Sequence, residues 1–339
     1  MKSPSFRHFR LIQVLGLSVF LLYAFLSSIG QPAHAQATFT VTNTNNSGSG
    51  SLRNAINNAN LNPGGDEVVF DIPGCSSATP CIISLATTLP LITDTLTISG
   101  IGASSLIVDG NNSSRIFNIA DVSVTISDLT IRNGNVAGRG AGIRSFGSLT
   151  LLRVHLQNNI AGKEGGGVYA AGNLTVIESF LTENVSFSDG GGIFAETGLT
   201  LVDTQLISNA GARGAGVFGG TEVWVTGGSF ELNQSEWNGG GLYATSAAMV
   251  TGTLFLGNHI AGYGYGGGLY AGDASEVREA WFEGNFADAG GGLYVDSALI
   301  LENTTFLGNN TVSDNGGGAF ADGDVSITGG QFEEKITGG

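Results

Sequence analysis

The sequence predicts an all-β fold, a right-handed parallel β-helix in which three short strands make one coil of about 25 residues. Glycine-rich marks recur at a near-constant spacing, and they begin at Gly140, Gly165, Gly190, Gly214, Gly239, Gly266, Gly290 and Gly316. A bulky apolar residue follows each mark after 16 positions, and seven of the eight marks have an Asn after 19 positions. A repeat of this length is typical of stacked, solenoid architectures.

Three apolar columns place the strands within each coil. When the first glycine of a mark is position zero, positions 3, 11 and 16 are apolar in every unit. In the unit that begins at Gly239, these residues are Leu242, Val250 and Phe255. Like residues would stack on like residues in successive coils, about 4.8 Å apart, which is the spacing of paired strands.

The interval between marks varies from 24 to 27 residues, whereas the offset from mark to Asn stays at 19. Length changes therefore fall in the segment after each Asn, which predicts a tolerant surface loop. Glycine suits the corners because it adopts positive φ without strain. Asn tolerates the left-handed region, and a column of Asn amides can form a structural ladder of hydrogen bonds. The column comprises Asn159, Asn184, Asn209, Asn233, Asn258, Asn285 and Asn309.

We expect residues 36–100 to form an N-terminal cap with the first coils, and residues 101–339 to form the repeat array. Ser51 is a suitable N-cap for a short amphipathic helix, and Pro63 ends it. Such a helix would cover the open end of the first coil. The other end shows no recognisable cap, so we expect an array that is truncated or uncapped there.

The N-terminus has the features of a signal peptide. Basic residues precede an apolar run over residues 11–26, and a small-x-small site predicts cleavage between Ala35 and Gln36. The prediction is an exported protein, extracellular or on the cell surface in association with an outer membrane. The mature chain has no second apolar run of spanning length, so no membrane span is expected.

Composition limits the classes of partner. Residues 1–35 hold three of the 13 Lys+Arg and no acid, which leaves ten basic against 28 acidic residues. Such an acidic chain is unsuited to nucleic acid and to anionic lipid. The 55 glycines accompany 42% hydrophobic residues, which favours a folded chain rich in turns over a disordered one. In an exported chain, Cys75 and Cys81 are expected to form a disulfide that fixes a local turn.

Two segments resemble known surface-protein families. The stretch from Phe39 to Gly74, which contains GSLRNA, resembles the N-terminal region of bacterial surface proteins with a CSLREA signature, although Gly50 and Asn54 replace its Cys and Glu. The array resembles the GGxI and FxxN motifs of chlamydial polymorphic outer-membrane proteins, as in Gly239-Gly240-Gly241-Leu242 followed by Phe255 and Asn258. This second resemblance implies a surface-displayed β-helical adhesin.

Two sets of aromatic residues are candidate binding sites for a glycan or for a surface protein of a host or neighbouring cell. Position 4 lies opposite to position 3 by strand alternation, so its aromatics are expected in an outward stripe. The alternative is a stack that only stabilises the sheet. The second set lies on the variable loops, where exposed aromatics suit recognition. The candidates are Tyr169, Phe194, Phe218, Tyr243, Tyr270, Tyr294 and Phe320 in the column, and Trp237, His259, Tyr263 and Tyr265 on the loops.

An enzyme is the main alternative, because β-helices also host polysaccharide lyases and hydrolases. Those reactions need clustered acids or a calcium cluster with a base. The mature chain has only His155 and His259, and its densest acidic spot, Asp322-Gly323-Asp324, is interpreted as a turn. We therefore expect no catalytic residue, no metal and no cofactor. The predicted function is an adhesion or display module, with a structural spacer or a fragment of a larger surface protein as a further alternative.

Overall fold

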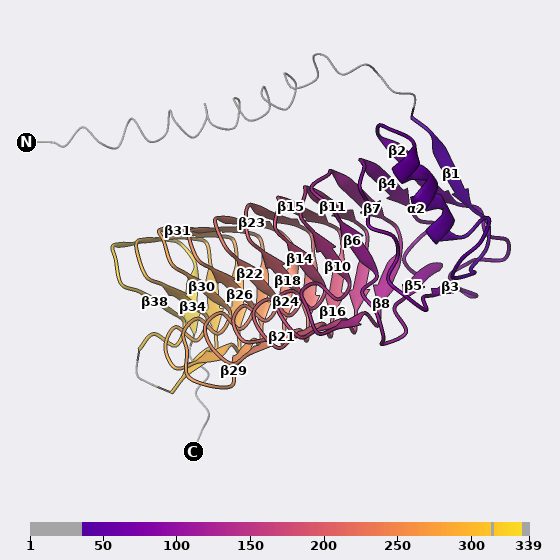
Figure 1. The fold of residues 1–339 in the computed structure, drawn as a ribbon. Helices are drawn as coiled ribbons and strands as arrows, with labels where there is room; N and C mark the ends of the chain where they lie inside the picture. Colours follow the sequence, from indigo (N-terminus) through magenta and orange to yellow (C-terminus); the bar gives the residue numbers. More distant parts are fainter. Residues whose placement is uncertain (1–35, 313–314, 334–339) are drawn as a thin grey trace, which may run out of the picture. The chain divides into compact units, whose positions relative to one another are not determined.

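The computed structural model describes residues 36–312 and 315–333. The chain after Ala35 forms one compact unit, a β-solenoid that Figure 1 shows coil by coil. The predicted signal peptide, including Ala35 of the predicted cleavage site, lies outside the described residues, as do residues 334–339. No helix in the described part of the chain is both long enough and apolar enough to cross a membrane.

Four parallel sheets run along the solenoid, and the longest of them, sheet A, has twelve strands. Its strands pair without lateral slip, so that Leu149 lies opposite Leu174 and Leu174 opposite Leu199. They are β1 (Thr38–Val41), β2 (Asp66–Phe70), β4 (Leu96–Ser99), β7 (Val124–Ser127), β11 (Leu149–Leu152), β15 (Leu174–Ile177), β19 (Leu199–Val202), β23 (Val223–Thr226), β27 (Ala248–Thr251), β31 (Ser275–Arg278), β35 (Leu299–Glu302) and β39 (Val325–Thr328).

Sheets B and C contain the other two strands that the apolar columns predict. Sheet B consists of β3 (Cys81–Ser84), β5 (Leu106–Asp109), β8 (Thr130–Arg132), β12 (His155–Gln157), β16 (Phe180–Thr182), β20 (Gln205–Ile207), β24 (Ser229–Glu231), β28 (Leu254–Leu256), β32 (Trp281–Glu283), β36 (Thr305–Leu307) and β40 (Gln331–Glu333). Sheet C consists of β6 (Phe117–Ile119), β10 (Ile143–Ser145), β14 (Val168–Ala170), β18 (Ile193–Ala195), β22 (Val217–Gly219), β26 (Leu242–Ala244), β30 (Leu269–Ala271), β34 (Leu293–Val295) and β38 (Ala319–Ala321).

The fourth sheet, D, differs from the expectation of three strands per coil. Its two-residue strands follow the Asn column directly, in the segment that the sequence assigned to the variable loop. Small side chains such as Ala161 and Ser186 face inward there. The strands are β9 (Asn135–Val136), β13 (Ile160–Ala161), β17 (Val185–Ser186), β21 (Ala210–Gly211), β25 (Gln234–Ser235), β29 (His259–Ile260), β33 (Phe286–Ala287) and β37 (Asn310–Thr311).

The inner faces of the sheets form one continuous core. In β11, Leu149 and Leu151 are buried and the intervening Thr150 points outward. The larger side chains at position 16 form an inner aromatic column of parallel rings, with centroids 4.5–4.9 Å apart. Its members are Phe230, Phe255, Phe282, Phe306 and Phe332. Apolar burial along this axis is the main stabilising contribution to each coil.

The Asn column is buried inside the turn between sheets B and D. Nδ2 of Asn159 donates to Oδ1 of Asn184 at 2.9 Å, and the backbone N–H of Asn159 donates to the same oxygen at 3.2 Å. This pattern continues from coil to coil as far as Asn309. The left-handed residue is the one before each column Asn, for example Asn158 with φ 55°, so the expectation that the column Asn itself adopts that region is wrong.

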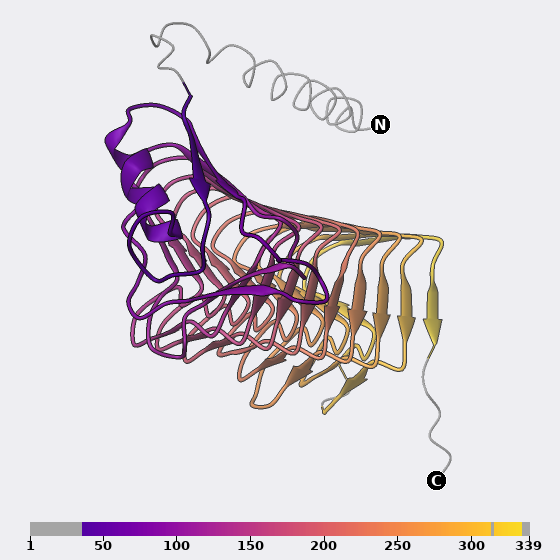
Figure 2. The ribbon, with the colours of Figure 1, turned by 90° about the vertical axis from the view of Figure 1, so that its right-hand side faces the viewer.

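Helix α2 (Leu52–Leu61) lies at the N-terminal end of the stack beside β1 and β2, where Figures 1 and 2 show it across the first coil. The Ser51 side chain accepts from the backbone N–H of Asn54 at 3.2 Å, which supplies the N-cap. The stripe of Leu52, Ala55, Ile56 and Ala59 is buried. Arg53 fixes the helix by donating to the carbonyl oxygens of Thr87 and Thr88.

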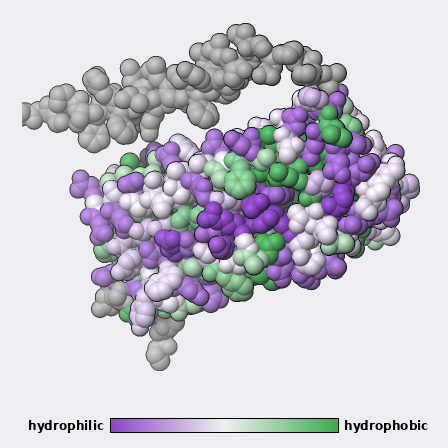
Figure 3. Space-filling model, viewed as in Figure 1, coloured by the Kyte–Doolittle hydropathy of each residue, from purple (hydrophilic) through white to green (hydrophobic). Residues whose placement is uncertain are grey.

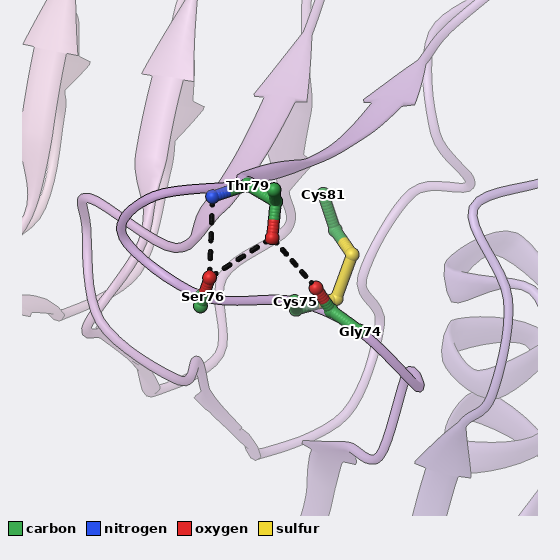
Figure 4. The surroundings of a disulfide bond; sticks show 5 residues. All are labelled: Gly74, Cys75, Ser76, Thr79 and Cys81. Carbon is green, nitrogen blue, oxygen red and sulfur yellow. Dashed lines mark hydrogen bonds between the residues drawn. A yellow bond between two sulfur atoms is a disulfide. The ribbon is translucent and has the colours of Figure 1, made fainter.

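A disulfide joins Cys75 to Cys81, with their Cα atoms 5.2 Å apart (Figure 4). The loop that it closes is also held from within. The Thr79 hydroxyl donates to the carbonyl oxygen of Gly74 at 2.9 Å, and the backbone N–H of Thr79 donates to the Ser76 hydroxyl at 3.2 Å. The bond therefore fixes a local loop just before β3 rather than linking distant coils.

Candidate binding surfaces on the loop side

The position-4 aromatics form a second, outer aromatic column on the side of sheet C away from the core. Successive rings stack with centroids 4.7–5.8 Å apart and interplanar angles of at most 20°. The column is mostly covered: Tyr169 is only 1% exposed, Phe218 is 6% exposed, and Tyr270 and Tyr294 are each 8% exposed. The expectation of an exposed stripe for ligand binding is therefore wrong for these four residues, while Phe194, Tyr243 and Phe320 are half-buried.

In the coils that begin at Gly140, Gly214 and Gly266, the residue that precedes the glycine mark covers part of the outer column. The guanidinium of Arg139 lies 5.0 Å from the ring centroid of Tyr169, and that of Arg213 lies 5.1 Å from Phe218. In a later coil, the ring of Tyr265 stacks on Tyr294 at 4.7 Å. These cation–π and ring contacts close the outer column from solvent.

Acidic side chains of the following coil hold the tyrosine hydroxyls of the outer column. Tyr169 donates to Glu196, and Tyr294 donates to Asp322 at 3.2 Å. Burial and these hydrogen bonds raise the pKa of Tyr169 and of Tyr294 to about 12. The two hydroxyls are therefore neutral hydrogen-bond donors in fixed geometry. Asp322 acts as the acceptor for one of them, Tyr294.

Several exposed aromatics lie on the variable loops. Tyr263 is 81% exposed, Trp237 is 53% exposed and Tyr265 is 43% exposed. His259 is also exposed, and its ring stacks on Phe286 at 4.9 Å. Tyr263 and Tyr265 border an open hollow of about 480 Å³. Its other lining residues are Asn238, Gly264, Asp288, Ala289, Val312 and Asn315.

The loop that carries Tyr263 and Tyr265 is held in place by its neighbours. Oδ1 of Asn238 accepts from the backbone N–H of Tyr265 at 2.9 Å, and Oδ2 of Asp288 accepts from that of Gly264 at 2.7 Å. Gly264 lies so close to the preceding coil that a Cβ there would be 2.8 Å from the carbonyl carbon of Trp237. Two aromatic rings are thus presented on a backbone fixed from both sides.

A second hollow, of about 290 Å³, lies further along the same side of the solenoid. It is lined by residues of β17, β21 and β25 and by Phe187, which is 77% exposed. Glu236, which directly follows β25, borders it as well. On the face seen in Figure 3, hydrophobic side chains lie in separate patches among hydrophilic ones, so hydropathy alone does not single out a docking area there.

Sequence reasoning named the aromatics of the first hollow and missed its polar residues. Asn238, Tyr265, Ala289 and Asn315 all occupy the position before a glycine mark. Their shared position in the repeat could therefore have identified these four lining residues from the sequence. The residue type at that position varies too much for composition to reveal it.

The residues considered for catalysis lie apart from one another. The ring of His155 packs edge-on against Phe180 at 4.8 Å on sheet B, and burial lowers its pKa. His259 is on sheet D, and Asp322 accepts the hydroxyl of Tyr294. Within residues 36–312 and 315–333, no three His, Cys, Asp or Glu side chains gather as a metal site would need.

Comparison with known protein families supports the β-helix fold. A family model described as a right handed beta helix region matches residues 178–332, a little under half of the chain. The match begins just before β16 and extends into β40. No curated protein matches the sequence. The repeats thus form a right-handed β-helix region, a parallel β-solenoid with four sheets and one short helix.

Proposed function

We propose that the protein is an exported adhesion or display module that binds a neutral glycan through the loop that carries Tyr263 and Tyr265. The observation that carries the proposal is the 81% exposure of the Tyr263 ring beside a hollow that also holds Asn238 and Asp288. Aromatic rings stack on the apolar faces of sugars, and carboxylate and amide groups bind sugar hydroxyls. The solenoid supplies a rigid scaffold for this loop.

The excess of acidic residues in the protein favours a neutral glycan over an anionic one. Without residues 1–35 the chain has ten basic and 28 acidic residues, and Asp288 and Glu236 lie at the two hollows. This net negative charge disfavours an anionic polysaccharide and does not act against a neutral one. The predicted signal peptide and the disulfide between Cys75 and Cys81 support placement outside the cytoplasm.

A neutral-glycan array tests the proposal. We expect Tyr263→Ala to weaken the best ligand about tenfold, which corresponds to about 1.4 kcal/mol. Trp281→Ala is the matched control, because Trp281 is a 43% exposed aromatic on the outer face of sheet B. Failure of the wild type to bind any neutral glycan would contradict the function, and would favour a structural spacer. Equal losses in the two variants would show that this loop is not the binding site.

A further inference from the structure

The carboxylate of Asp66 connects three parts of the N-terminal cap. Asp66 is the first residue of β2 and is only 2% exposed. Its Oδ1 accepts from the backbone N–H of Ala37, just before β1, at 2.9 Å. The same oxygen accepts from Nδ2 of Asn62, the C-cap residue of helix α2, at 2.8 Å. One buried oxygen atom therefore joins the first strand and the helix to the second strand.

The other carboxylate oxygen, Oδ2 of Asp66, is buried and has no hydrogen-bond partner among the described residues. A buried carboxylate is costly to the fold unless its charge is paired and its oxygens are bonded. The neighbouring Glu67 differs, because it is half-buried and its Oε1 accepts from the Ser99 hydroxyl at 2.9 Å. Oδ2 of Asp66 is therefore a site for a missing donor, and a cationic donor would also pair the charge.

The side chains of the cap do not supply this cation. Residues 36–100 contain four acidic residues and a single basic one, Arg53. The Arg53 guanidinium is already engaged with the carbonyl oxygens of Thr87 and Thr88. Within the described chain, no ion pair includes Asp66. One further source of positive charge within a protein chain is the α-amino group of a free N-terminus.

The N-terminus that removal of the predicted signal peptide creates lies next to this carboxylate. Cleavage is predicted between Ala35 and Gln36, and Gln36 directly precedes the residue whose N–H already binds Asp66. Standard bond lengths place consecutive backbone nitrogens at most about 3.7 Å apart. Ala37 itself is fixed, because its carbonyl oxygen accepts from the backbone N–H of Glu67 at 2.9 Å. Rotation about the bonds of Gln36 alone is therefore sufficient to bring its nitrogen to Oδ2.

We propose that removal of the signal peptide completes the N-terminal cap, with the new α-ammonium group of Gln36 pairing with Oδ2 of Asp66. Hydrolysis of the peptide bond consumes one water, leaves a carboxylate on Ala35 and leaves an amine on Gln36 that takes up a proton. Before cleavage this nitrogen is an uncharged amide with a single N–H, and afterwards it is a cation with three N–H donors. The inference rests on the signal peptide of the proposed function, but not on glycan binding.

The test uses the processed chain, exported from a bacterial host with its own signal peptide and purified whole. Intact mass identifies the first residue, and an NMR titration of the ¹⁵N-labelled protein gives the pKa of the α-amino group. We expect a chain that begins at Gln36 and an α-amino pKa above the usual value of about 8, because the carboxylate stabilises the ammonium form. In Asp66→Asn, whose amide oxygen can still accept from Ala37, this pKa should return to about 8.

Cyclisation of the N-terminal glutamine gives a second reading of the same pair. In this reaction the neutral α-amine of Gln36 attacks the side-chain carbonyl carbon, forms a lactam and releases ammonia. A paired ammonium group has no lone pair for the attack, so the wild type should cyclise at least fivefold more slowly than Asp66→Asn. Asp94→Asn is the matched control and should cyclise at the wild-type rate. It removes a carboxylate of the same cap, one that accepts from the backbone N–H of Gly64 at 3.0 Å.

Circular dichroism shows whether each variant is folded. If Asp66→Asn fails to fold, the wild type alone decides, because its α-amino pKa should fall when the protein is unfolded in concentrated urea. An α-amino pKa that is the same in both states would overturn the proposal. So would a mature chain that begins at a residue other than Gln36, or one that is isolated already as the lactam. None of these outcomes depends on a glycan, so this proposal and the binding function fail separately.

Discussion

The inner and outer aromatic columns use the same geometry in two different environments. Rings stack at 4.5–4.9 Å inside the solenoid and at 4.7–5.8 Å outside sheet C. The inner column is all Phe, and four of its five members are at most 1% exposed. The outer column mixes Phe with Tyr and is closed by polar groups such as Arg139 and Glu196.

This difference shows that each coil has two buried layers with separate requirements. Side chains of the inner layer need only to be apolar and of the right shape, because the strands of the solenoid enclose them. The outer layer is covered in part by side chains that precede glycine marks, such as those of Arg139, Arg213 and Tyr265. The loops therefore help to cover the outer column, while side chains such as Tyr263, which is 81% exposed, project beyond the cover.

The largest effect expected from this comparison is the loss of an inner ring. Phe255→Ala should lower the free energy of unfolding by about 3–5 kcal/mol, because it leaves a cavity between two stacked rings. Phe218→Ala in the outer column should cost less, since the neighbouring Arg213 can settle over the gap. Denaturant unfolding of both variants measures the difference. Equal losses would show that the two layers are equivalent.

The next effect concerns the Asn ladder, which borders the inner column. Asn209→Ala removes the oxygen that accepts from both the backbone N–H and Nδ2 of Asn184. Each buried donor left without a partner costs about 1–3 kcal/mol. Faster hydrogen exchange at the Asn184 amide would report the loss locally. Asn310→Ala, at an exposed Asn of sheet D, is the control. It should change neither the free energy of unfolding nor hydrogen exchange at the Asn184 amide.

A smaller effect of opposite sign is expected at Leu232, which precedes Asn233. Leu232 has φ 54° and is 59% exposed, whereas the equivalent residues of the next coils are Gly257, Gly284 and Gly308. Leu232→Gly should relieve strain and stabilise the protein by about 0.5–1 kcal/mol after the entropic cost of glycine. The thermal midpoint should rise. A fall would mean that the Leu232 side chain contributes packing that outweighs the strain.

The smallest effect is confined to alkaline pH and tests the closure of the outer column. Burial and bonding to Glu196 raise the pKa of Tyr169 to about 12, above the usual value of about 10. A raised pKa contributes stability that is complete below pH 10 and is lost as the pH rises toward 12. The unfolding midpoint of the wild type should therefore fall between pH 10 and pH 12, and in Tyr169→Phe this fall should be smaller. Tyrosinate absorbance gives the ionisation directly, and full ionisation near pH 10 would contradict the closed arrangement.

The sequence predicted the architecture well because the apolar columns are strictly phased. The comparison and the structure confirm a right-handed parallel β-solenoid with a short N-terminal helix, including the buried stripe from Leu52 to Ala59. The fourth sheet was not predictable, since strands of two residues with small inward side chains such as Ala161 show no alternation. The left-handed corner was placed one residue late, because Asn occurs on both sides of that boundary in the first coil.

Prediction of the site was less complete, for a different reason. Exposed Trp237 and Tyr263 were recognisable as aromatics on loops of variable length. The cover over Tyr169 and Tyr294 was not, because it comes from residues as different as Arg139 and Tyr265. Outward orientation on a strand follows from alternation, but exposure depends on what the neighbouring loop places above it.

The hydrogen bonds between successive side-chain amides of the Asn ladder all run in one direction. Every amide oxygen from Asn184 to Asn309 accepts from the preceding coil, so each side-chain dipole has its negative end toward the N-terminal helix. Seven aligned dipoles polarise one another, and a break in the middle leaves two shorter rows. The solenoid therefore has an electrical polarity along its axis, and damage at Asn209 should weaken coils on both sides while damage at Asn309 is felt mainly on one.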